Sequence, residues 1–588
     1  MYLRTAAACI AAASACTNIL VPAGSSVDGS TIIAYNADSP GFVGALSHWP
    51  AGKHEAGEKR EIYRWDDGKR LGAIPQVPET YNVVGNTNEH QLTIGESTFG
   101  GLEMLDASGD QAVCDPDHGC IDYGQLIWVT LGRAKTAREA ITTMDHLMQT
   151  YGYASSGESF SIADTKEVWL MEVIGKGNIT KGSVWVATKI PDGSVCAHAN
   201  QARTTKFIPN QPDVFQHSPD VITFAKKLKL YDGEDADFSF SDVYDPLTFE
   251  GARFCEARVY SFFSKIAADE ERITDHLDYV KGYNLTNRMP LYVKARHPVS
   301  VNETMWHMRN HFEGMWFDPS KDVSAGPWQG PERLGVPLTY KTKGKEYVNE
   351  RFIGTQYTGW GMVANQRPAH KFSVLWFGVD DASFSVRVPF YGATTRVPTT
   401  WSDANCTGLD PCRKAHGLPG TMLKFSMHNM FWINSLVANY AYSRYDAIAP
   451  AVQRRLVEIE GELMHALEKA DAEVDKADNA VEEATKFSYT AAERVHKAWM
   501  ELFGELFTTY VDGYTAVPDP TNKVCECKKQ QNPFPAEWNE EVAARAGDHY
   551  RVPDATIRGR QGVIPKTRLA ALGGGVSTAC EQAEEVVV

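Results

Sequence analysis

The chain has 588 residues, of which 43% are hydrophobic and 11% aromatic. This composition is typical of a folded globular protein and excludes a collagenous or wholly disordered chain. At about 100 to 200 residues per domain, the length allows several domains or one large domain with appendages. Lys and Arg number 58 against 74 Asp and Glu, a net charge of −16, so nucleic acid is not expected as a partner.

The first fifteen residues have the pattern of a signal peptide. Arg4 precedes a short apolar segment at 6–13, and Ala13-Ser14-Ala15 is an A-x-A cleavage site. The apolar segment is shorter than the roughly 20 residues of a membrane span, so no span is expected. An uncleaved anchor or a disordered Ala-rich tail are the alternatives. Export predicts a secreted, periplasmic or lysosomal protein, and cleavage after Ala15 leaves Cys16 as its first residue.

The region after Cys16 mixes short strands with one long helix. Residues 17–21 and 30–34 flank an Asp28-Gly29 turn and predict a hairpin that starts at Cys16. Residues 134–151 have apolar side chains at helical spacing and end at Gly152, whereas 159–163, 168–173 and 183–187 predict three consecutive strands. The pattern indicates an α+β domain with substantial sheet.

The rest of the chain divides into segments of different composition. Residues from about 205 to 440 are aromatic-rich and irregular, without the linker composition that would mark a boundary. Apolar residues at helical spacing in 456–467 and in 495–507 predict a helical hairpin. We therefore expect a signal peptide at 1–15, one large domain at 16–445, a helical extension packed on it at 446–514 and a loosely ordered tail at 515–588.

The chain has eleven cysteines, and if it is exported all but Cys9, which leaves with the signal peptide, would meet an oxidising environment. Cys114/Cys120 and Cys406/Cys412 each span a short polar loop and are expected to form small disulfides. Four sequons, at Asn178, Asn284, Asn302 and Asn405, fit a secreted glycoprotein. His307 and His311 have helical spacing but lack the H-E-x-x-H order, so no metal site is expected.

An N-terminal cysteine carries its own base. Its α-amine, with an ordinary pKa of about 7.7 to 8.0, accepts the thiol proton directly or through a water. The reaction then needs hydrogen-bond donors for the oxyanion and a carboxylate to orient the ammonium group. The alternatives for Cys16 are a disulfide cysteine or an acylated lipoprotein cysteine.

A family resemblance extends over the chain from 16 to about 514. It rests on Cys16-Thr17-Asn18, Asp28-Gly29-Ser30 and the segments 34–39, 81–91, 95–101, 122–126, 135–141, 157–164, 169–173, 198–203, 308–314, 374–382 and 510–514. In this order the segments resemble the dipeptidases of peptidase family C69, which are similar to penicillin V acylases and bile-salt hydrolases. The resemblance implies an N-terminal-nucleophile hydrolase, an αββα sandwich that cleaves small peptides or amides through a thioester, without a cofactor.

The resemblance also assigns residues. It makes Cys16 the nucleophile, Asp38 the carboxylate that orients the α-amine, and Asn200 an oxyanion donor. Arg253 matches an arginine placed near the nucleophile, with Arg258 close enough in sequence to take its place.

Two positions depart from the wider superfamily. Tyr35 stands where an arginine is usual and supplies no positive charge, and Thr98 stands where the acylases have a second oxyanion asparagine, leaving its backbone N–H as donor. Glu96 and Glu172 are candidates for binding the ammonium group of a dipeptide, or are ordinary hydrogen-bonded carboxylates at strand ends.

Three functions therefore remain open from the sequence. The first is a dipeptidase acting on small peptides, and the second is a hydrolase of N-acyl amides on the same fold. The third is an inactive secernin-like protein, which the Tyr35 departure favours. Homo-oligomerisation is possible in each case.

Overall fold

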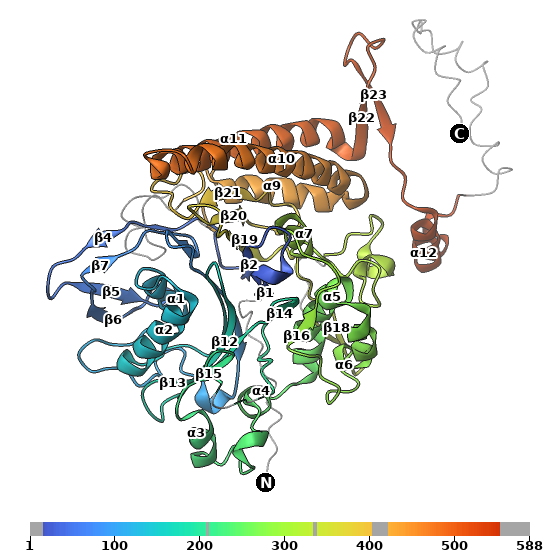
Figure 1. Ribbon diagram of the computed structural model, residues 1–588. Coiled ribbons are helices and arrows are strands. Elements are labelled where there is room, and N and C mark those ends of the chain that lie inside the picture. The colour runs from blue at the N-terminus through green and yellow to red at the C-terminus, as the bar shows by residue number, and fades with distance from the viewer. Residues whose placement is uncertain (1–15, 207, 209–210, 333–337, 403–421, 553–588) are drawn as a thin grey trace, which may run out of the picture. The chain divides into compact units, whose positions relative to one another are not determined.

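Two antiparallel sheets packed face to face form the centre of the larger of two units (Figure 1). The computed structural model describes residues 16–206, 208, 211–332, 338–402 and 422–552. The larger unit extends to Asn532, and the smaller one starts at Pro533. In the described part of the smaller unit, helix α12 (Ala536–Ala546) is followed by a 3-10 turn, Gly547–Tyr550.

The first sheet has seven strands and carries Cys16 at the start of a central one. Its order is β16 (Tyr292–Lys294), β14 (Ser194–His198), β1 (Thr17–Val21), β2 (Thr31–Asp38), β19 (Thr358–Gln366), β20 (Val374–Val379) and β21 (Val388–Tyr391). Every residue of β1 and β2 is buried. Neither strand alternates between buried and exposed side chains, as is expected where both faces of a sheet are covered.

The second sheet has eight strands. Its order is β15 (Phe215–His217), β13 (Ser183–Lys189), β12 (Val168–Gly175), β11 (Gly157–Ala163), β10 (Thr93–Gly100), β9 (Thr87–Asn88), β8 (Val83–Val84) and β3 (His48–Trp49). Strands β1 and β2 of the first sheet pack across β10 of the second. Strand β9 pairs with β10 only at Thr93. Beyond that residue the edge of β10 is not covered by β9, and β10 contacts β1, the strand that follows Cys16.

Helices cover the outer face of each sheet and complete an αββα sandwich (Figure 1). On the eight-stranded sheet lie α1 (Tyr123–Leu131) and α2 (Ala137–Tyr151). The seven-stranded sheet is covered by α5 (Ala257–Ile266), α7 (Val301–His307), α9 (Met430–Ser443), α10 (Tyr445–Val474) and α11 (Ala480–Tyr510). The expected fold class, an αββα sandwich with a C-terminal helical extension, is confirmed.

Short elements decorate this frame. The short helices are α3 (Val221–Lys227), α4 (Phe240–Tyr244) and α6 (Leu277–Val280). Two-stranded sheets pair β4 (Gly52–Lys53) with β7 (Glu79–Thr80), β5 (Lys59–Tyr63) with β6 (Arg70–Pro75), β17 (Thr339–Thr342) with β18 (Lys345–Val348), and β22 (Tyr514–Pro518) with β23 (Cys527–Gln531).

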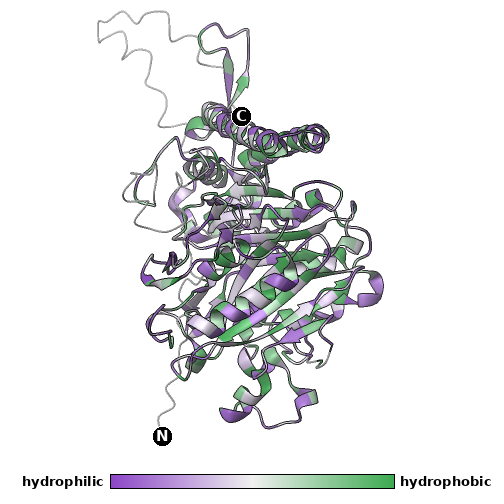
Figure 2. Cartoon of the chain, turned by 60° about the vertical axis from the view of Figure 1, so that its left-hand side comes forward, coloured by the Kyte–Doolittle hydropathy of each residue, from purple (hydrophilic) through white to green (hydrophobic). Residues whose placement is uncertain are grey.

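The helical extension is tied to the sandwich by charged as well as apolar side chains. In Figure 2 the strands are largely hydrophobic, whereas the long helices alternate hydrophobic and hydrophilic residues, as helices with one packed face do. Glu460 of α10 is buried and its Oε1 accepts from Arg309 (2.5 Å) and from the backbone N–H of Arg387 (2.8 Å). Farther along α10, Asp471 receives both Nη atoms of Arg367 (2.6 and 2.9 Å) and the hydroxyl of Tyr391 (2.7 Å).

Local signals explain where the elements begin. The expected helix at 134–151 starts later, at Ala137, because the Thr136 side chain accepts from the backbone N–H of Glu139 and caps it. The two periodic segments at 456–467 and 495–507 are parts of the much longer α10 and α11. Between α9 and α10 the chain turns at Arg444 alone.

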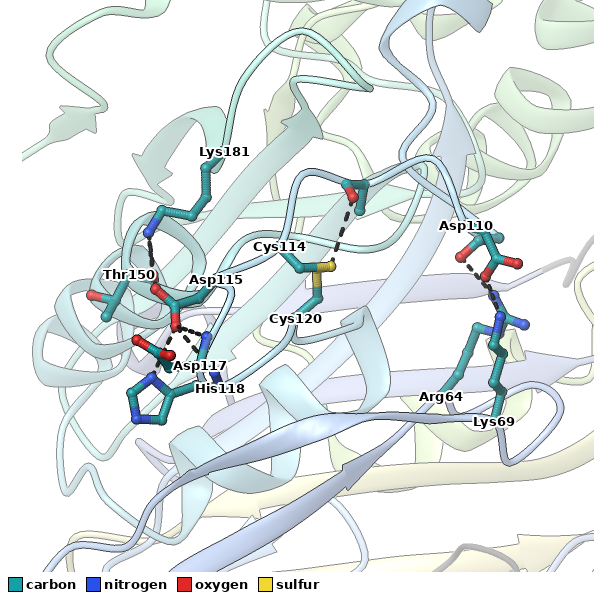
Figure 3. Close-up of a disulfide and its surroundings, with 12 residues drawn as sticks. Arg64, Lys69, Asp110, Cys114, Asp115, Asp117, His118, Cys120, Thr150 and Lys181 are labelled. Atoms are coloured by element: carbon teal, nitrogen blue, oxygen red, sulfur yellow. Dashed lines mark hydrogen bonds and ion pairs between the residues drawn. A yellow bond between two sulfur atoms is a disulfide. The ribbon is translucent and has the colours of Figure 1, made fainter.

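Cys114 and Cys120 are joined in a disulfide that closes the loop before α1 (Figure 3). Within the loop, Asp115 accepts from the ring of His118 (2.9 Å) and from Lys181 (3.4 Å). The second expected pair, Cys406/Cys412, lies outside the described residues. The sequon residues Asn178, Asn284 and Asn302 are exposed, and Asn405 also lies outside the described residues.

The charged links between α10 and the sandwich predict a stability difference between two neighbouring glutamates. Glu460→Ala leaves Arg309 buried without its partner and should lower the free energy of unfolding by about 3 to 5 kcal/mol. Glu462, also on α10, forms an exposed ion pair with Arg494 of α11, and Glu462→Ala should cost less than about 1 kcal/mol. Denaturant unfolding of both variants checks this, and equal effects would mean that α10 is not anchored through Glu460.

Candidate active site

Cys16 lies at the amino end of β1, between the two sheets, and is fully buried. Strand β1 pairs with β2 so that Thr17 faces Asn36 and Asn18 faces Tyr35. Continued by one residue, this antiparallel register places Ala37 and Asp38 beside the amino end of Cys16. Strand pairing alone thus brings Ala37 and Asp38, which are more than 20 positions away in the sequence, next to Cys16.

The thiol of Cys16 faces a tyrosine and a glutamate. It lies 3.7 Å from the hydroxyl of Tyr35 and 3.5 Å from Oε1 of Glu96, and the Tyr35 hydroxyl also donates to Glu96. Burial, followed by the negative charges of Glu96 and Asp38, raises the pKa of Cys16 well above its ordinary value. The thiol is therefore protonated in this form, and attack on a carbonyl requires a base that takes its proton.

Asp38 ends β2 with one satisfied and one unsatisfied oxygen. Its Oδ1 accepts from the hydroxyl of Thr358 (2.6 Å), whereas the buried Oδ2 has no hydrogen-bond partner among the described residues. Burial raises the pKa of Asp38 to about 8, although the positive charges of Arg258 and Arg351 oppose this. A buried carboxyl oxygen without a donor is costly and marks a place where a donor is missing.

Arg258 of α5 holds the nucleophile and Asn200 together. Its Nη1 donates to the carbonyl of Cys16 and to Thr17 Oγ1 (both 2.8 Å), and its Nη2 donates to Asn200 Oδ1 (2.9 Å). Because Oδ1 is taken by the guanidinium, the amide nitrogen of Asn200 faces β10, where it donates to the carbonyl of Thr98 (2.5 Å). Asn200 has a left-handed φ of 57°, a conformation that asparagine tolerates better than most residues.

Arg253 lies apart from this group. Its guanidinium pairs with Glu350 and stacks on Trp316 and Phe317, 4.8 and 4.9 Å from their ring centres. The π-helical segment Gly251–Glu256 precedes α5, so spacing from sequence does not say which arginine turns inward. Of the two arginines weighed from the sequence, the structure places Arg258 in contact with Cys16.

Thr98 and Glu172 have clear partners. The Thr98 hydroxyl donates to Glu158 Oε1 (2.8 Å). Glu172 is fully buried, and its two oxygens accept from the backbone N–H groups of Arg203 (2.6 Å) and Thr204 (2.9 Å). These contacts fix the loop after Asn200, whereas binding of substrate by Glu172 stays a prediction.

Three further residues belong to this region and were not singled out from the sequence. Glu158 on β11 is buried next to Glu96, and Arg351 is the second positive charge near Asp38. His198 is fully buried, bonds Ser97 and Ser161 (both 2.7 Å), and burial lowers its pKa to about 3. His198 is thus a neutral bridge between the sheets, and only its place in the 198–203 segment signalled it.

The histidine pair predicted to lack a metal has other partners. His311 bonds Glu313 (3.0 Å) and Ser383 (2.8 Å), and His307 packs edge-on against Phe262. Within the described ranges no cluster of three or more His, Cys, Asp or Glu is arranged to hold a metal ion. Over the same ranges, no helix combines the length and apolar character needed to cross a bilayer.

An αββα sandwich with a buried cysteine at the head of a central strand defines the N-terminal-nucleophile class of hydrolase fold. A family model described as peptidase family C69 matches residues 15–457. That match covers most of the chain, and the chain belongs to this family.

Curated proteins with similar sequences are named as dipeptidases or probable dipeptidases. A probable dipeptidase of Salmonella dublin is 27% identical over 364 residues, covering 59% of this chain and 78% of the relative. Dipeptidase A of Lactobacillus helveticus is 22% identical over 73% of this chain and 82% of its own. Probable dipeptidase B of Lactococcus lactis is 21% identical over 84% of this chain and 94% of its own. The chain is thus a peptidase by family, and its cysteine site is the one to test.

Arg258 is predicted to matter more for turnover than Arg253. Arg258→Lys keeps the charge but loses the planar fork that binds Cys16 and Asn200 together. We expect kcat on a peptide substrate to fall by about 100-fold, the scale of losing a preorganised oxyanion donor. Arg253→Lys serves as the matched control in steady-state kinetics, and an equal loss of kcat in both variants would contradict the assignment.

Proposed function

We propose that the protein is an exported cysteine dipeptidase that becomes active when cleavage after Ala15 makes Cys16 the first residue. Cys16 attacks the scissile carbonyl of a dipeptide, and its own α-amine takes the thiol proton. The carbonyl carbon bonds to sulfur, and the second amino acid leaves as an amine that receives the proton back. Water then hydrolyses the thioester and releases the first amino acid.

The unsatisfied oxygen of Asp38 carries this proposal. Asp38 Oδ2 is buried and has no donor within the described part of the chain, and it lies beside the amino end of Cys16 in the β1–β2 register. A free terminal ammonium at Cys16 would supply both the missing hydrogen bond and a positive charge. The same charge would offset the burial that raises the pKa of Asp38 and the pKa of the thiol.

The other parts of the site have matching roles. Asn200, its amide oriented by Arg258, is the side-chain donor to the oxyanion, and the backbone N–H of Thr98 is the second donor. Tyr35 and Glu96 face the sulfur, and Glu96 binds the ammonium group of the substrate. Positive charge that Tyr35 cannot supply comes from Arg258 and Arg351, which lie near Asp38.

The substrate choice follows from the sign of the charges at Cys16. The carboxylic groups nearest the sulfur are Glu96 and Asp38, which suits a substrate with a free ammonium group. An N-acyl amide, as cleaved by a penicillin V acylase or bile-salt hydrolase, presents an apolar acyl group here instead. The relatives named as dipeptidases support the same choice.

We also propose that the protein works outside the cytoplasm. The signal-like segment at 1–15 would both export the chain and expose Cys16, so one cleavage performs both tasks. The Cys114–Cys120 disulfide fits an oxidising compartment, and the exposed sequon residues leave room for glycans. Secretion, the periplasm and a lysosome are all compatible with this.

Cys16→Ala tests the proposal. The variant should lose dipeptide hydrolysis completely, because it removes the sulfur on which the thioester forms. Cys196→Ala, which alters another buried cysteine of the same sheet, is the matched control and should keep near-normal kcat. Hydrolysis that survives in Cys16→Ala contradicts the mechanism, and a wild type that cleaves N-acyl amides but not dipeptides contradicts the substrate.

A further inference from the structure

A second glutamate lies beside Glu96 on the face of the eight-stranded sheet that α1 covers. Thr98 of β10 faces Glu158 of β11 in the strand register, and Glu96 is two residues before Thr98 on β10. Residues two apart on a strand share a face, so Glu96, Thr98 and Glu158 point to the same side. The hydroxyl of Thr98 donates to Glu158 Oε1 (2.8 Å) and holds this carboxyl in place.

The two carboxyl groups are buried with no cation beside them. Glu96 is 2% exposed and Glu158 1%, and the Oε2 atom of each lacks a conventional hydrogen-bond donor among the described residues. None of the ion pairs found in the described ranges involves either residue. Burial and then the charge of Glu96 raise the pKa of Glu158 well above its ordinary value, so Glu158 is the carboxyl that keeps its proton.

Burial is the largest cause of the raised pKa of both groups, and it brings Glu96 to about 7. Near neutral pH at least one of the two carboxyls is therefore protonated. Such a pair has unfilled capacity for a cation, because an ammonium group can replace a carboxyl proton and donate to both groups.

Several other buried carboxylates, away from Cys16, have donors supplied by the protein. Glu460 binds Arg309, Asp471 binds Arg367, and Glu256 binds Arg203 (2.9 Å). Glu172 accepts two backbone N–H groups. These carboxylates, which hold elements of the fold together, receive their donors from the protein. Among the described residues Glu96 and Glu158 have no cation, which points to a donor from outside.

The distance to the nucleophile fits the first residue of a peptide. In an amino acid the nitrogen lies about 2.5 Å from its own carbonyl carbon, by the standard bond lengths and angle. Glu96 Oε1 is 3.5 Å from Cys16 Sγ, so a carbonyl carbon bonded to this sulfur would place its α-ammonium against the carboxyl pair. Cleavage would then fall after the first residue of the substrate.

Negative charge continues from the pair to the surface. Asp66 is exposed and accepts from the hydroxyl of Tyr123 (2.8 Å), the first residue of α1. The charge of Asp66 acts on both Glu96 and Glu158. A cationic substrate group approaching from Asp66 would therefore meet increasingly buried negative charge.

Resting on the dipeptidase proposal, we propose that Glu158 is a specificity-determining residue that, with Glu96, receives the free α-ammonium group of the substrate's first residue and rejects N-acylated peptides. The ammonium displaces the proton of Glu158, which leaves to solvent, and donates to both carboxylates. An N-acyl nitrogen is neutral and has a single N–H, so it leaves at least one buried carboxyl oxygen unsatisfied.

Glu158→Gln tests this with two substrates, alanyl-alanine and N-acetyl-alanyl-alanine. The variant keeps the shape and the Thr98 hydrogen bond, but it cannot take up the negative charge that Glu158 gains when the ammonium group displaces its proton. We expect the ratio of kcat/KM for the free over the acetylated peptide to fall by about tenfold or more, mainly through a higher KM for the free peptide. Glu462→Gln, an exposed glutamate on α10, is the matched control and should leave the ratio unchanged.

The outcomes separate this inference from the dipeptidase proposal. An unchanged ratio in a Glu158→Gln variant with native circular dichroism overturns the role of Glu158, provided that Cys16→Ala is inactive. Dipeptide hydrolysis that survives in Cys16→Ala overturns the dipeptidase proposal itself. If Glu158→Gln does not fold, Glu158→Asp carries the same test, because it withdraws the charge by one methylene group and should also lower the ratio.

Discussion

The pairing of β1 with β2 is the constraint on which the site depends. Thr17 faces Asn36 in that ladder, which fixes the amino end of Cys16 against Asp38 before any side chain is considered. A slip of one residue would turn Cys16 and Tyr35 to the opposite face of the sheet. Such a slip is costly, because every residue of β1 and β2 is buried.

The second constraint on the site is the burial of charged side chains. The sandwich buries many carboxylates, and it pairs those that hold the fold together, such as Glu460 with Arg309 and Asp471 with Arg367. Around Cys16 the pattern differs, because among the described residues one oxygen each of Asp38, Glu96 and Glu158 has no hydrogen-bond partner. Active sites are where such shifted groups gather. Here the two unsatisfied places correspond to two ammonium groups, one made by processing and one brought by a substrate.

Much of the fold could be predicted from the sequence, since its signals are local. The 17–21 strand, the Gly152 helix end and the apolar spacing of 456–467 and 495–507 all correspond to elements of the structure. Contacts between residues that are far apart in the sequence were harder to predict. Glu158 is 62 positions from Glu96, and only the β10–β11 register, with its irregularity between Thr98 and Gly100, brings them together.

The choice between Arg253 and Arg258 shows why spacing alone was insufficient for the site. The two residues are five positions apart, and the π-helical turn at Gly251–Glu256 changes which side chains face inward. Cys16, Tyr35, Asp38, Glu96 and Asn200 were selected from short motifs, and the structure gathers them at one end of the sandwich. Their catalytic roles stay a proposal, because geometry shows proximity and not turnover.

The mature N-terminus is the central claim, since the base, the counter-ion of Asp38 and the exposure of the nucleophile all depend on it. Intact-mass measurement with terminal sequencing of the purified native protein tests it most directly. The account predicts a chain that begins at Cys16 with a free amine. A chain that begins at Met1, or one with an acylated Cys16, would contradict it, because the α-amine could then serve neither as base nor as the partner of Asp38.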